Sequence, residues 1–253
     1  MDAALRGTVA LVTGASSGIG AATAEALADR GAAVALVARR AERLDELSGR
    51  LRDAGATALV IAADMTDETQ VREAVERTVN ELGRLDTLVN NAGLMILGRA
   101  ADAGTDEWRR MTDINLTGLM NTTHAALPHL IAAAADGDRR VADIVNVSSV
   151  AGRLAVATAA GYCATKYGVV AFSEALRQET AAQHVRVSVV EPGAVDTELR
   201  EHNSPEVQEQ LTRLFGSIER LEARDVADTI GYIVSRPRHV AVSELLVRPT
   251  EQV

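Results

Sequence analysis

The sequence has 253 residues, a length that suits one large α/β domain or two small ones. Although 47% of the residues are hydrophobic, they include only one Trp, three Tyr and two Phe, so Ala, Val, Leu and Ile must build the core. The formal charge is −9 and basic residues are scattered among acidic ones, which argues against nucleic acid or an anionic membrane as a partner.

Short apolar runs alternate with longer amphipathic stretches along most of the chain. The runs that predict buried strands lie at 8–12, 33–38, 58–63, 86–90, 143–148 and 185–191. Helical patterns lie between them at 18–30, 40–54, 67–82, 105–135 and 162–183. Repeated βαβ units build a parallel sheet with right-handed crossovers. The sequence therefore predicts an α/β fold, a single-domain Rossmann-type doubly wound parallel sheet over residues 1–253.

The pattern changes after the sixth strand, where residues 198–223 are polar and charged. Apolar residues recur there every three or four positions, at Val207, Leu211, Leu214 and Ile218. This spacing predicts a helix that could form a substrate lid, or equally a surface helix packed on the core. A further helix at 224–235 and a last strand at 243–247 complete the predicted elements.

A glycine-rich turn, Thr13-Gly14-Ala15-Ser16-Ser17-Gly18-Ile19-Gly20, follows the first strand and opens the first helix. Glycines let the backbone approach a pyrophosphate, whose charge then lies against the free N–H groups of the helix. The strand before the turn and the helix after it favour nucleotide binding over an ordinary tight turn. The predicted contacts in the turn are Gly14, Ser16, Ser17, Gly18, Ile19 and Gly20.

The same turn also satisfies the G-x-S-x-G pattern of the serine hydrolase elbow. That elbow needs earlier strands, one of which carries an oxyanion-hole loop, and only about a dozen residues precede this turn. The five histidines fall mostly in predicted helices or in the tail. A serine hydrolase is therefore a distant alternative.

Two arginines, Arg39 and Arg40, end the second predicted strand, where an NAD-binding fold usually carries an acidic residue. Cations at the start of a helix oppose its dipole, and a 2′-phosphate would compensate for that cost. The alternative is that both are surface arginines paired with Glu42, or with Asp45 and Glu46. We expect NADP(H) as the cofactor.

Tyr162 and Lys166 stand four residues apart at the start of a predicted helix and therefore share one face. A free tyrosine has a pKa of about 10, and a nearby ammonium would lower it, so that the phenol could act as acid or base. Such a pair alone is often an ordinary exposed one. Ser148-Ser149 at the end of the fifth strand adds a hydroxyl at the edge where ligands bind in this fold.

The cysteine, the histidines and the N-terminal sequence predict a cytoplasmic protein that binds no metal. The single cysteine, Cys163, excludes an internal disulfide, and we expect it to be a small packed side chain. The five histidines form no metal-ligand cluster. The N-terminus lacks the pattern of a signal peptide, and no run reaches the ~18 apolar residues of a membrane span.

Together these motifs resemble the classical short-chain dehydrogenases/reductases over almost the whole chain. TGASSGIG at 13–20 is similar to the family's cofactor turn, NNAG at 90–93 to its motif after the fourth strand, and YCATK at 162–166 to its YxxxK. The resemblance implies a catalytic tetrad of Asn115, Ser149, Tyr162 and Lys166, in which Asn115 holds a water that links Lys166 to solvent. It implies hydride transfer between NADP(H) and a carbonyl or alcohol, with Tyr162 as the acid or base.

The resemblance also implies cofactor contacts beyond the glycine-rich turn and the two arginines. Asp64 would contact the adenine, and Pro192-Gly193 with Thr197 would receive the nicotinamide. The full set from later parts of the chain is Asp64, Met65, Asn91, Ala92, Gly93, Tyr162, Lys166, Pro192, Gly193, Val195 and Thr197.

Within the family, the segments SEALRQE at 173–179, EPGAVDTELR at 191–200 and VRPTEQV at the end are most similar to clavulanate-dehydrogenase-like and 3-hydroxy-acid (serine) dehydrogenase-like enzymes. The stretch 243–249 departs from the Gly-rich stretch that many members carry there. The resemblance implies a homodimer or homotetramer that pairs helices around 105–135 and 162–183. The Ala-rich, Arg-over-Lys composition indicates a high-GC bacterial source and a biosynthetic substrate.

Substrate identity is set by loops around 94–100, 150–158 and 194–220, whose conformation the sequence does not give. The apolar residues of these loops are compatible with a partly apolar pocket and equally with loop packing; they are Met95, Ile96, Leu97, Leu154 and Val156. A non-enzymatic sensor that binds NADP(H) is the second hypothesis, although an idle site need not keep all four tetrad residues.

Overall fold

A seven-stranded parallel sheet forms the centre of the protein in a computed structural model that describes residues 4–252. Its strands are β1 (Val9–Thr13), β2 (Ala33–Ala38), β3 (Ala58–Ala62), β4 (Thr87–Asn90), β5 (Ala142–Val147), β6 (Val185–Pro192) and β7 (Glu244–Val247). The strand order is β3-β2-β1-β4-β5-β6-β7, and every pair is parallel. The order reverses between β1 and β4, which creates a switch point at the carboxyl edge. The predicted doubly wound fold is confirmed.

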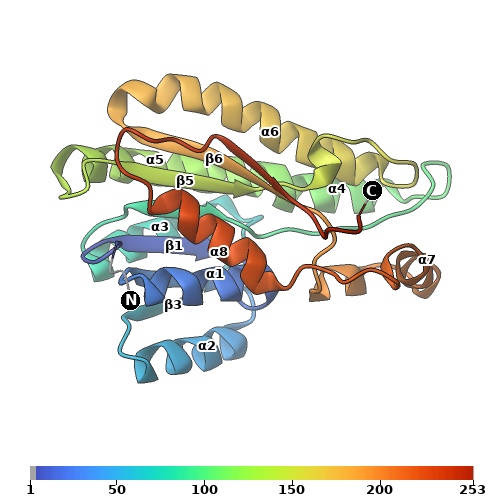
Figure 1. Ribbon diagram of the computed structural model, residues 1–253, viewed down its shortest axis with the longest axis horizontal. Helices are drawn as coiled ribbons and strands as arrows, with labels where there is room; N and C mark the ends of the chain where they lie inside the picture. Colours follow the sequence, from blue (N-terminus) through green and yellow to red (C-terminus); the bar gives the residue numbers. More distant parts are fainter. Residues whose placement is uncertain (1–3, 253) are drawn as a thin grey trace.

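Helices cover both faces of the sheet (Figure 1). They are α1 (Gly18–Asp29), α2 (Ala41–Asp53), α3 (Glu68–Leu82), α4 (Thr105–Thr112), α5 (Gly118–Asp136), α6 (Ala160–Thr180), α7 (Pro205–Phe215) and α8 (Ala223–Val234). One core cluster joins α1, α2 and α8 to the sheet, and a second joins α3, α5 and α6. Successive residues of β1 alternate between the two clusters, because side chains of a strand point to opposite faces.

The predicted helix at 105–135 is confirmed, but it is not α-helical throughout. Residues Thr105–Thr112 and Gly118–Asp136 are α-helical, but a π-helical turn, Asp113–Thr117, separates them. Such a wide turn inserts an extra residue into the helix, and apolar periodicity does not reveal it. Its consequence is local, because the turn holds Asn115, one of the predicted tetrad residues.

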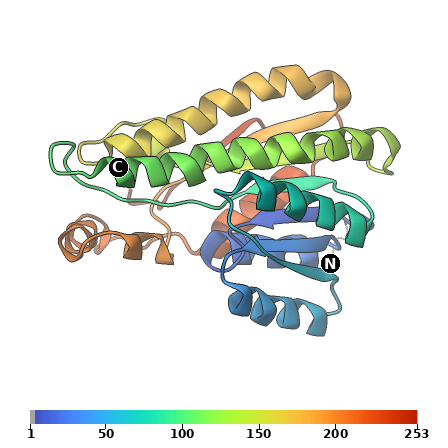
Figure 2. The same cartoon turned by 180° about the vertical axis from the view of Figure 1, so that it is seen from behind.

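The segment 198–223 begins with a 3-10 turn, Glu198–His202, and continues into α7. Ser204 caps α7, since its hydroxyl accepts a hydrogen bond from the Val207 amide at 3.4 Å. Leu211 is buried, whereas Leu214 is 68% exposed, so only a narrow stripe of α7 packs on the body. Figure 2 shows α7 at one end of the molecule, apart from the helices that cover the sheet. Its function as a lid stays a prediction.

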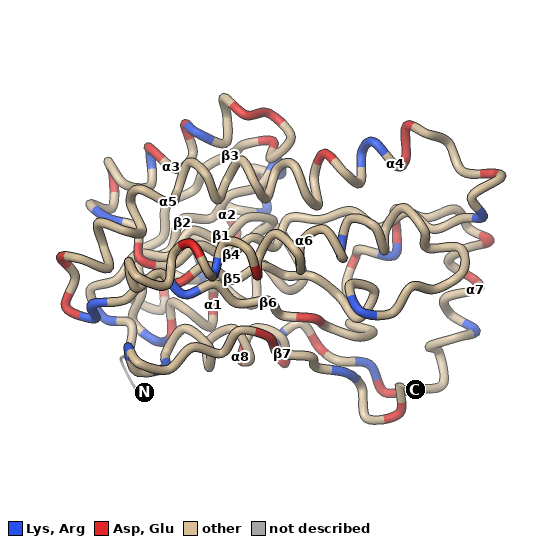
Figure 3. The backbone as a smooth tube through the Cα atoms, turned by 90° about the horizontal axis from the view of Figure 1, so that it is seen from above, with Lys and Arg blue, Asp and Glu red and all other residues tan. Residues whose placement is uncertain are grey.

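Along the backbone, the charged residues lie mainly on helices and loops, with both signs interspersed (Figure 3). Between residues 4 and 252, no helix is both long and apolar enough to cross a membrane. The same part of the chain contains no group of three or more His, Cys, Asp or Glu side chains placed to hold a metal ion.

Candidate active site

A cleft of about 1200 Å³ opens at the carboxyl ends of the strands, where the sheet has its switch point. It extends from the glycine-rich turn and Arg39 to Tyr162 and α7. Every predicted site residue lines this cleft except Gly20 and Asn115. The structure therefore brings together side chains from both halves of the chain at the edge where doubly wound sheets bind ligands.

The glycine-rich turn adopts a backbone that only glycine accepts without strain. Gly14 and Gly18 have φ angles of +67° and +53°, in the left-handed region. Gly20 does not line the cleft, but a Cβ there would lie 2.3 Å from the Gly14 carbonyl oxygen. Gly20 therefore allows α1 to pack closely against the turn, and its contact with a cofactor stays a prediction.

Thr13 joins the two strands at the switch point, a contribution that the sequence did not predict. Its hydroxyl accepts hydrogen bonds from the amides of Asn91 at 3.0 Å and Ala92 at 3.1 Å. The Asn91 side chain in turn donates to the Thr13 carbonyl at 3.0 Å. These bonds hold the segment 91–93 directly beside the glycine-rich turn.

Arg40 lies across the glycine-rich turn. Its Nη2 donates to the Ser17 hydroxyl at 2.7 Å, and its Nε donates to the Ser16 hydroxyl at 3.2 Å. Nη1 contacts the Glu198 carboxylate at 2.8 Å, and this hydrogen bond lowers the pKa of Glu198. The alternative that Arg40 pairs with acidic residues of α2 is therefore wrong. Since the Ser16 hydroxyl bonds to Arg40 and not to a histidine, the hydrolase alternative loses its nucleophile.

Arg39 and Asp64 line the same end of the cleft. Arg39 is exposed and makes no ion pair within residues 4–252. One carboxylate oxygen of Asp64 accepts hydrogen bonds from the amide and the hydroxyl of Thr66, at 2.9 and 2.8 Å. These two bonds fix the turn after β3. The Arg39 guanidinium, which lines the same end of the cleft, is able to bind an anionic group.

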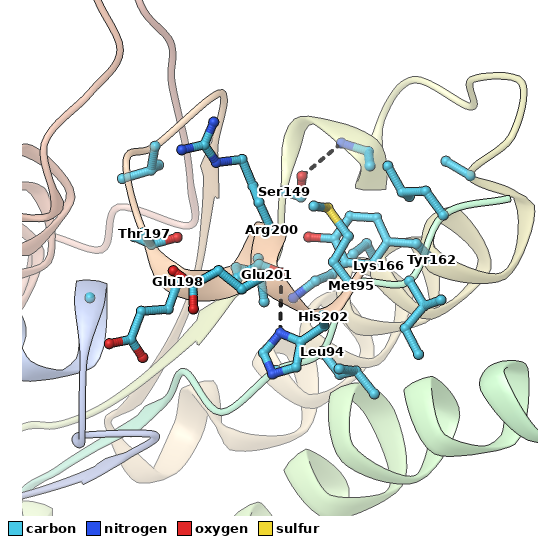
Figure 4. A pocket seen from close by; sticks show the side chains of 18 of the residues that line it. Leu94, Met95, Ser149, Tyr162, Lys166, Thr197, Glu198, Arg200, Glu201 and His202 are labelled. Atoms are coloured by element: carbon cyan, nitrogen blue, oxygen red, sulfur yellow. Dashed lines mark hydrogen bonds between the residues drawn. The ribbon is translucent and has the colours of Figure 1, made fainter. Parts of the chain in front are cut away.

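Ser149, Tyr162 and Lys166 meet at the other end of the cleft (Figure 4). Ser149 lies two residues after the end of β5 and accepts a hydrogen bond from the Ala151 amide at 3.1 Å. Tyr162 and Lys166 occupy one face of α6, and each is only 6% exposed. The Lys166 Nζ donates to the Val147 carbonyl at 2.9 Å and lies 5.7 Å from the centre of the Tyr162 ring.

Burial dominates the protonation of this pair. It raises the pKa of Tyr162 to about 12, while a hydrogen bond from Ser149 acts in the opposite direction. Burial also lowers the pKa of Lys166 to about 8. Desolvation of the phenolate is the largest influence on the Tyr162 pKa in this structure. At neutral pH the phenol is therefore protonated. That Lys166 lowers the Tyr162 pKa stays a prediction.

Asn115 stands behind the cleft wall, at 1% exposure. Its side chain accepts a hydrogen bond from the Leu94 amide at 2.7 Å and donates to the Leu94 carbonyl at 2.8 Å. It also donates to the Thr165 hydroxyl at 3.1 Å, on the helix of Lys166. Asn115 thus joins the π-helical turn, the segment after Gly93 and α6. The predicted water link to Lys166 stays a prediction.

Apolar and charged side chains both line the end of the cleft beyond Tyr162. The charged ones include Arg200 and Glu201, with His202 beside them. The apolar ones are Leu94, Met95, Ile96, Leu97, Val156, Val207, Leu211, Leu214 and Phe215. Leu154, which the sequence placed with these residues, does not line the cleft and is 53% exposed. Gln252 was not predicted, yet its Oε1 accepts a hydrogen bond from the Ala194 amide at 2.8 Å beside Gly193. Nothing in the sequence pattern of the tail signals this contact.

Comparisons with known proteins agree with this geometry. The sequence profile described as short chain dehydrogenase matches residues 8–208. An uncharacterized oxidoreductase of Staphylococcus saprophyticus is 34% identical over 96% of this chain and 96% of its own. Glycine betaine reductase of Emericella nidulans is 39% identical over 98% of this chain, which spans only 19% of that longer protein.

Solved structures share the whole fold. The closed form of a serine dehydrogenase complexed with NADP+ matches with a TM-score of 0.88 at 30% identity, over 97% of this chain and 96% of that one. A 3-ketoacyl-(acyl-carrier-protein) reductase from Brucella melitensis complexed with NADH matches with a TM-score of 0.85 at 31% identity, over 96% and 97% of the two chains.

Proposed function

Because this chain belongs to the short-chain dehydrogenase/reductase family, we propose that it is an NADP(H)-dependent oxidoreductase that interconverts a carbonyl and an alcohol. The observation that carries the proposal is the convergence of Ser149, Tyr162 and Lys166 in the cleft that also holds the glycine-rich turn. A hydroxyl, a protonated phenol and an ammonium at one site can bind an oxygen and move a proton to it.

The residues of the cleft fit a dinucleotide with a 2′-phosphate. The turn before α1 offers amides and serine hydroxyls to a pyrophosphate. At the end of β2, where NAD-binding folds usually carry an acidic residue, this chain has Arg39 and Arg40. Because similar structures were solved with NADP+ and with NADH, the preference for NADP(H) rests on these two arginines.

NADPH bound in the cleft would supply the hydride that reduces the carbonyl carbon of the substrate. Ser149 and Tyr162 hold the carbonyl oxygen by hydrogen bonds, and the Tyr162 hydroxyl donates its proton to that oxygen as negative charge develops. The pKa of Tyr162, near 12, keeps the proton on the phenol at neutral pH, which suits the acid required for reduction. Lys166 supplies a positive charge beside the phenolate that results.

Apolar side chains beyond Tyr162 line part of the cleft that would receive the substrate. A small-molecule carbonyl compound with an apolar substituent fits those side chains. The assembly of the protein as a homodimer or homotetramer stays a prediction.

The test is consumption of NADPH with a panel of ketones and aldehydes, with the alcohol product identified by mass spectrometry. We expect turnover with NADPH to exceed turnover with NADH at equal concentrations. Tight binding of NADPH without turnover of any carbonyl or alcohol would instead support a non-enzymatic sensor.

A further inference from the structure

The wall formed by residues 94–98 has no regular secondary structure, so its backbone groups depend on partners elsewhere in the fold. At its beginning, the Asn115 side chain pairs with both the amide and the carbonyl of Leu94. At its end, the Gly98 amide donates to the Thr158 carbonyl at 2.7 Å. The amide of Leu97 and the carbonyl of Met95, between these points, are satisfied by one side chain, that of Asn203.

Asn203 belongs to the segment between the 3-10 turn and α7, more than one hundred residues further along the chain. Its Oδ1 accepts a hydrogen bond from the Leu97 amide at 2.7 Å, and its Nδ2 donates to the Met95 carbonyl at 3.0 Å. Nδ2 also donates to the Arg200 carbonyl at 3.1 Å. The residue is only 5% exposed, so these bonds are shielded from water.

The wall that carries α7 has few other attachments at this end of the cleft. Leu211 is the buried apolar residue of α7, whereas Leu214 is exposed. At the cofactor end, the segment is held by the ion pair between Glu198 and Arg40. A segment with few buried apolar contacts opens at low cost unless specific hydrogen bonds hold it.

From these contacts we infer that Asn203 is a positioning residue that fixes the 198–215 wall against the 94–98 wall and thereby sets the width of the substrate end. This inference rests on the proposed function, because both walls line the cleft beside Tyr162. Asn203 touches neither the reacting atoms nor the cofactor residues, so its effect is on how the carbonyl is held. Removal of the Asn203 side chain would leave the Leu97 amide and the Met95 carbonyl without these hydrogen bonds, and a buried polar group without a partner is costly.

The test uses two variants and a matched control. Asn203→Ala removes both bonds to the 94–98 wall, and Asn203→Asp keeps the shape but removes the donor to Met95. Glu209→Gln is the control, because it removes the exposed ion pair between Glu209 and Arg213 on α7, and Glu209 does not line the cleft. We expect KM for the carbonyl substrate to rise about tenfold or more in both Asn203 variants, with the Kd for NADPH unchanged. The control should stay within about twofold of the wild type.

Amide hydrogen exchange provides a readout that does not depend on turnover. In both Asn203 variants the Leu97 amide and α7 should exchange faster, whereas Glu209→Gln should leave exchange of the Leu97 amide unchanged. Unchanged exchange at Leu97, or an equal rise of KM in the control, would overturn the inference. If the wild type has no carbonyl activity, the proposed function fails, while the exchange result still decides whether Asn203 joins the two walls.

Discussion

At the scale of single residues, burial rather than exposure gives the candidate site its chemistry. Tyr162 and Lys166 are both almost completely buried, and this shifts their pKa values in opposite directions, to about 12 and about 8. Burial therefore favours the neutral phenol of Tyr162 and the neutral amine of Lys166 more than water does. In the proposed reduction, the phenol must be protonated and the ammonium must be charged, so the lysine sets the upper pH limit.

The first prediction concerns that limit. Because the Lys166 pKa is lowered, its positive charge is present below pH 8 and is lost as the pH rises through about 8. We expect kcat/KM for carbonyl reduction to fall above this pH, well before the phenol of Tyr162 ionises. The measurement is a pH profile from pH 6 to 10 with the protein shown to be folded throughout. A flat profile up to pH 10 would show that the ammonium is not required.

The second prediction concerns Arg40, whose guanidinium contacts Ser16, Ser17 and Glu198. Replacement of Arg40 by Ala should raise the Kd for NADPH about tenfold or more, because a hydrogen bond to a charged group is worth ~1.5–3 kcal/mol. The Kd for NADH should change little. Glu198→Gln is the matched variant, which frees Arg40 from its carboxylate and should tighten NADPH binding. Equal weakening of NADPH and NADH would contradict the assignment of Arg40 to a 2′-phosphate.

At the scale of elements, the site depends on how loops and turns leave the sheet. The segment after β4 lies against the glycine-rich turn through Thr13, and the π-helical turn carries Asn115 to the back of the 94–98 wall. The close approach of α1 to the turn depends on Gly20, which has no room for a side chain. The geometry of the cofactor end is therefore set by backbone packing.

The third prediction tests that packing. Gly20→Ala places a Cβ 2.3 Å from the Gly14 carbonyl oxygen, so the turn must shift. Overpacking of this kind costs about 1–3 kcal/mol, and NADPH binding should weaken as well. Gly49→Ala is the control, since nothing lies within 4 Å of a Cβ there and Ala favours the interior of α2. Urea unfolding and NADPH titration of both variants check the expectation, which fails if Gly20→Ala behaves like the control.

Sequence patterns predicted the strands well, because a buried parallel strand is a continuous apolar run and its carboxyl end marks the ligand edge. They also placed Ser149, Tyr162 and the two arginines at the same edge of the sheet. The helix at 105–135 was predicted, but its π-helical turn was not, since the extra residue of such a turn leaves no trace in apolar spacing. The Asn203 contacts could not be predicted, because no local pattern relates an amide side chain to a backbone more than one hundred residues away.

At the scale of the whole molecule, the two edges of the sheet serve different purposes. The carboxyl edge carries the cleft, while the amino edge carries a buried ion pair between neighbouring residues of β5 and β6. Asp143 and Arg186 face each other in register, with Nε–Oδ1 and Nη2–Oδ2 distances of 2.7 and 3.0 Å. Burial raises the pKa of Asp143, and the charge of Arg186 opposes that shift.

The fourth prediction separates stability from activity. Asp143→Ala leaves the guanidinium of Arg186 buried without its carboxylate, which should lower the free energy of unfolding by about 3–5 kcal/mol. KM and the pH profile of the folded variant should match those of the wild type, because the ion pair lies at the opposite edge from the cleft. Denaturant unfolding and steady-state kinetics measure the two effects. A changed KM with unaltered stability would contradict this division.

The most direct measurement of the proposed chemistry is a single turnover of Tyr162→Phe with NADPH already bound. The variant keeps the ring and removes only the hydroxyl that donates the proton. We expect the rate of hydride transfer to a carbonyl to fall by ~10²–10⁴, while the Kd for NADPH stays that of the wild type. Wild-type transfer by Tyr162→Phe would contradict the assignment of Tyr162 as the acid.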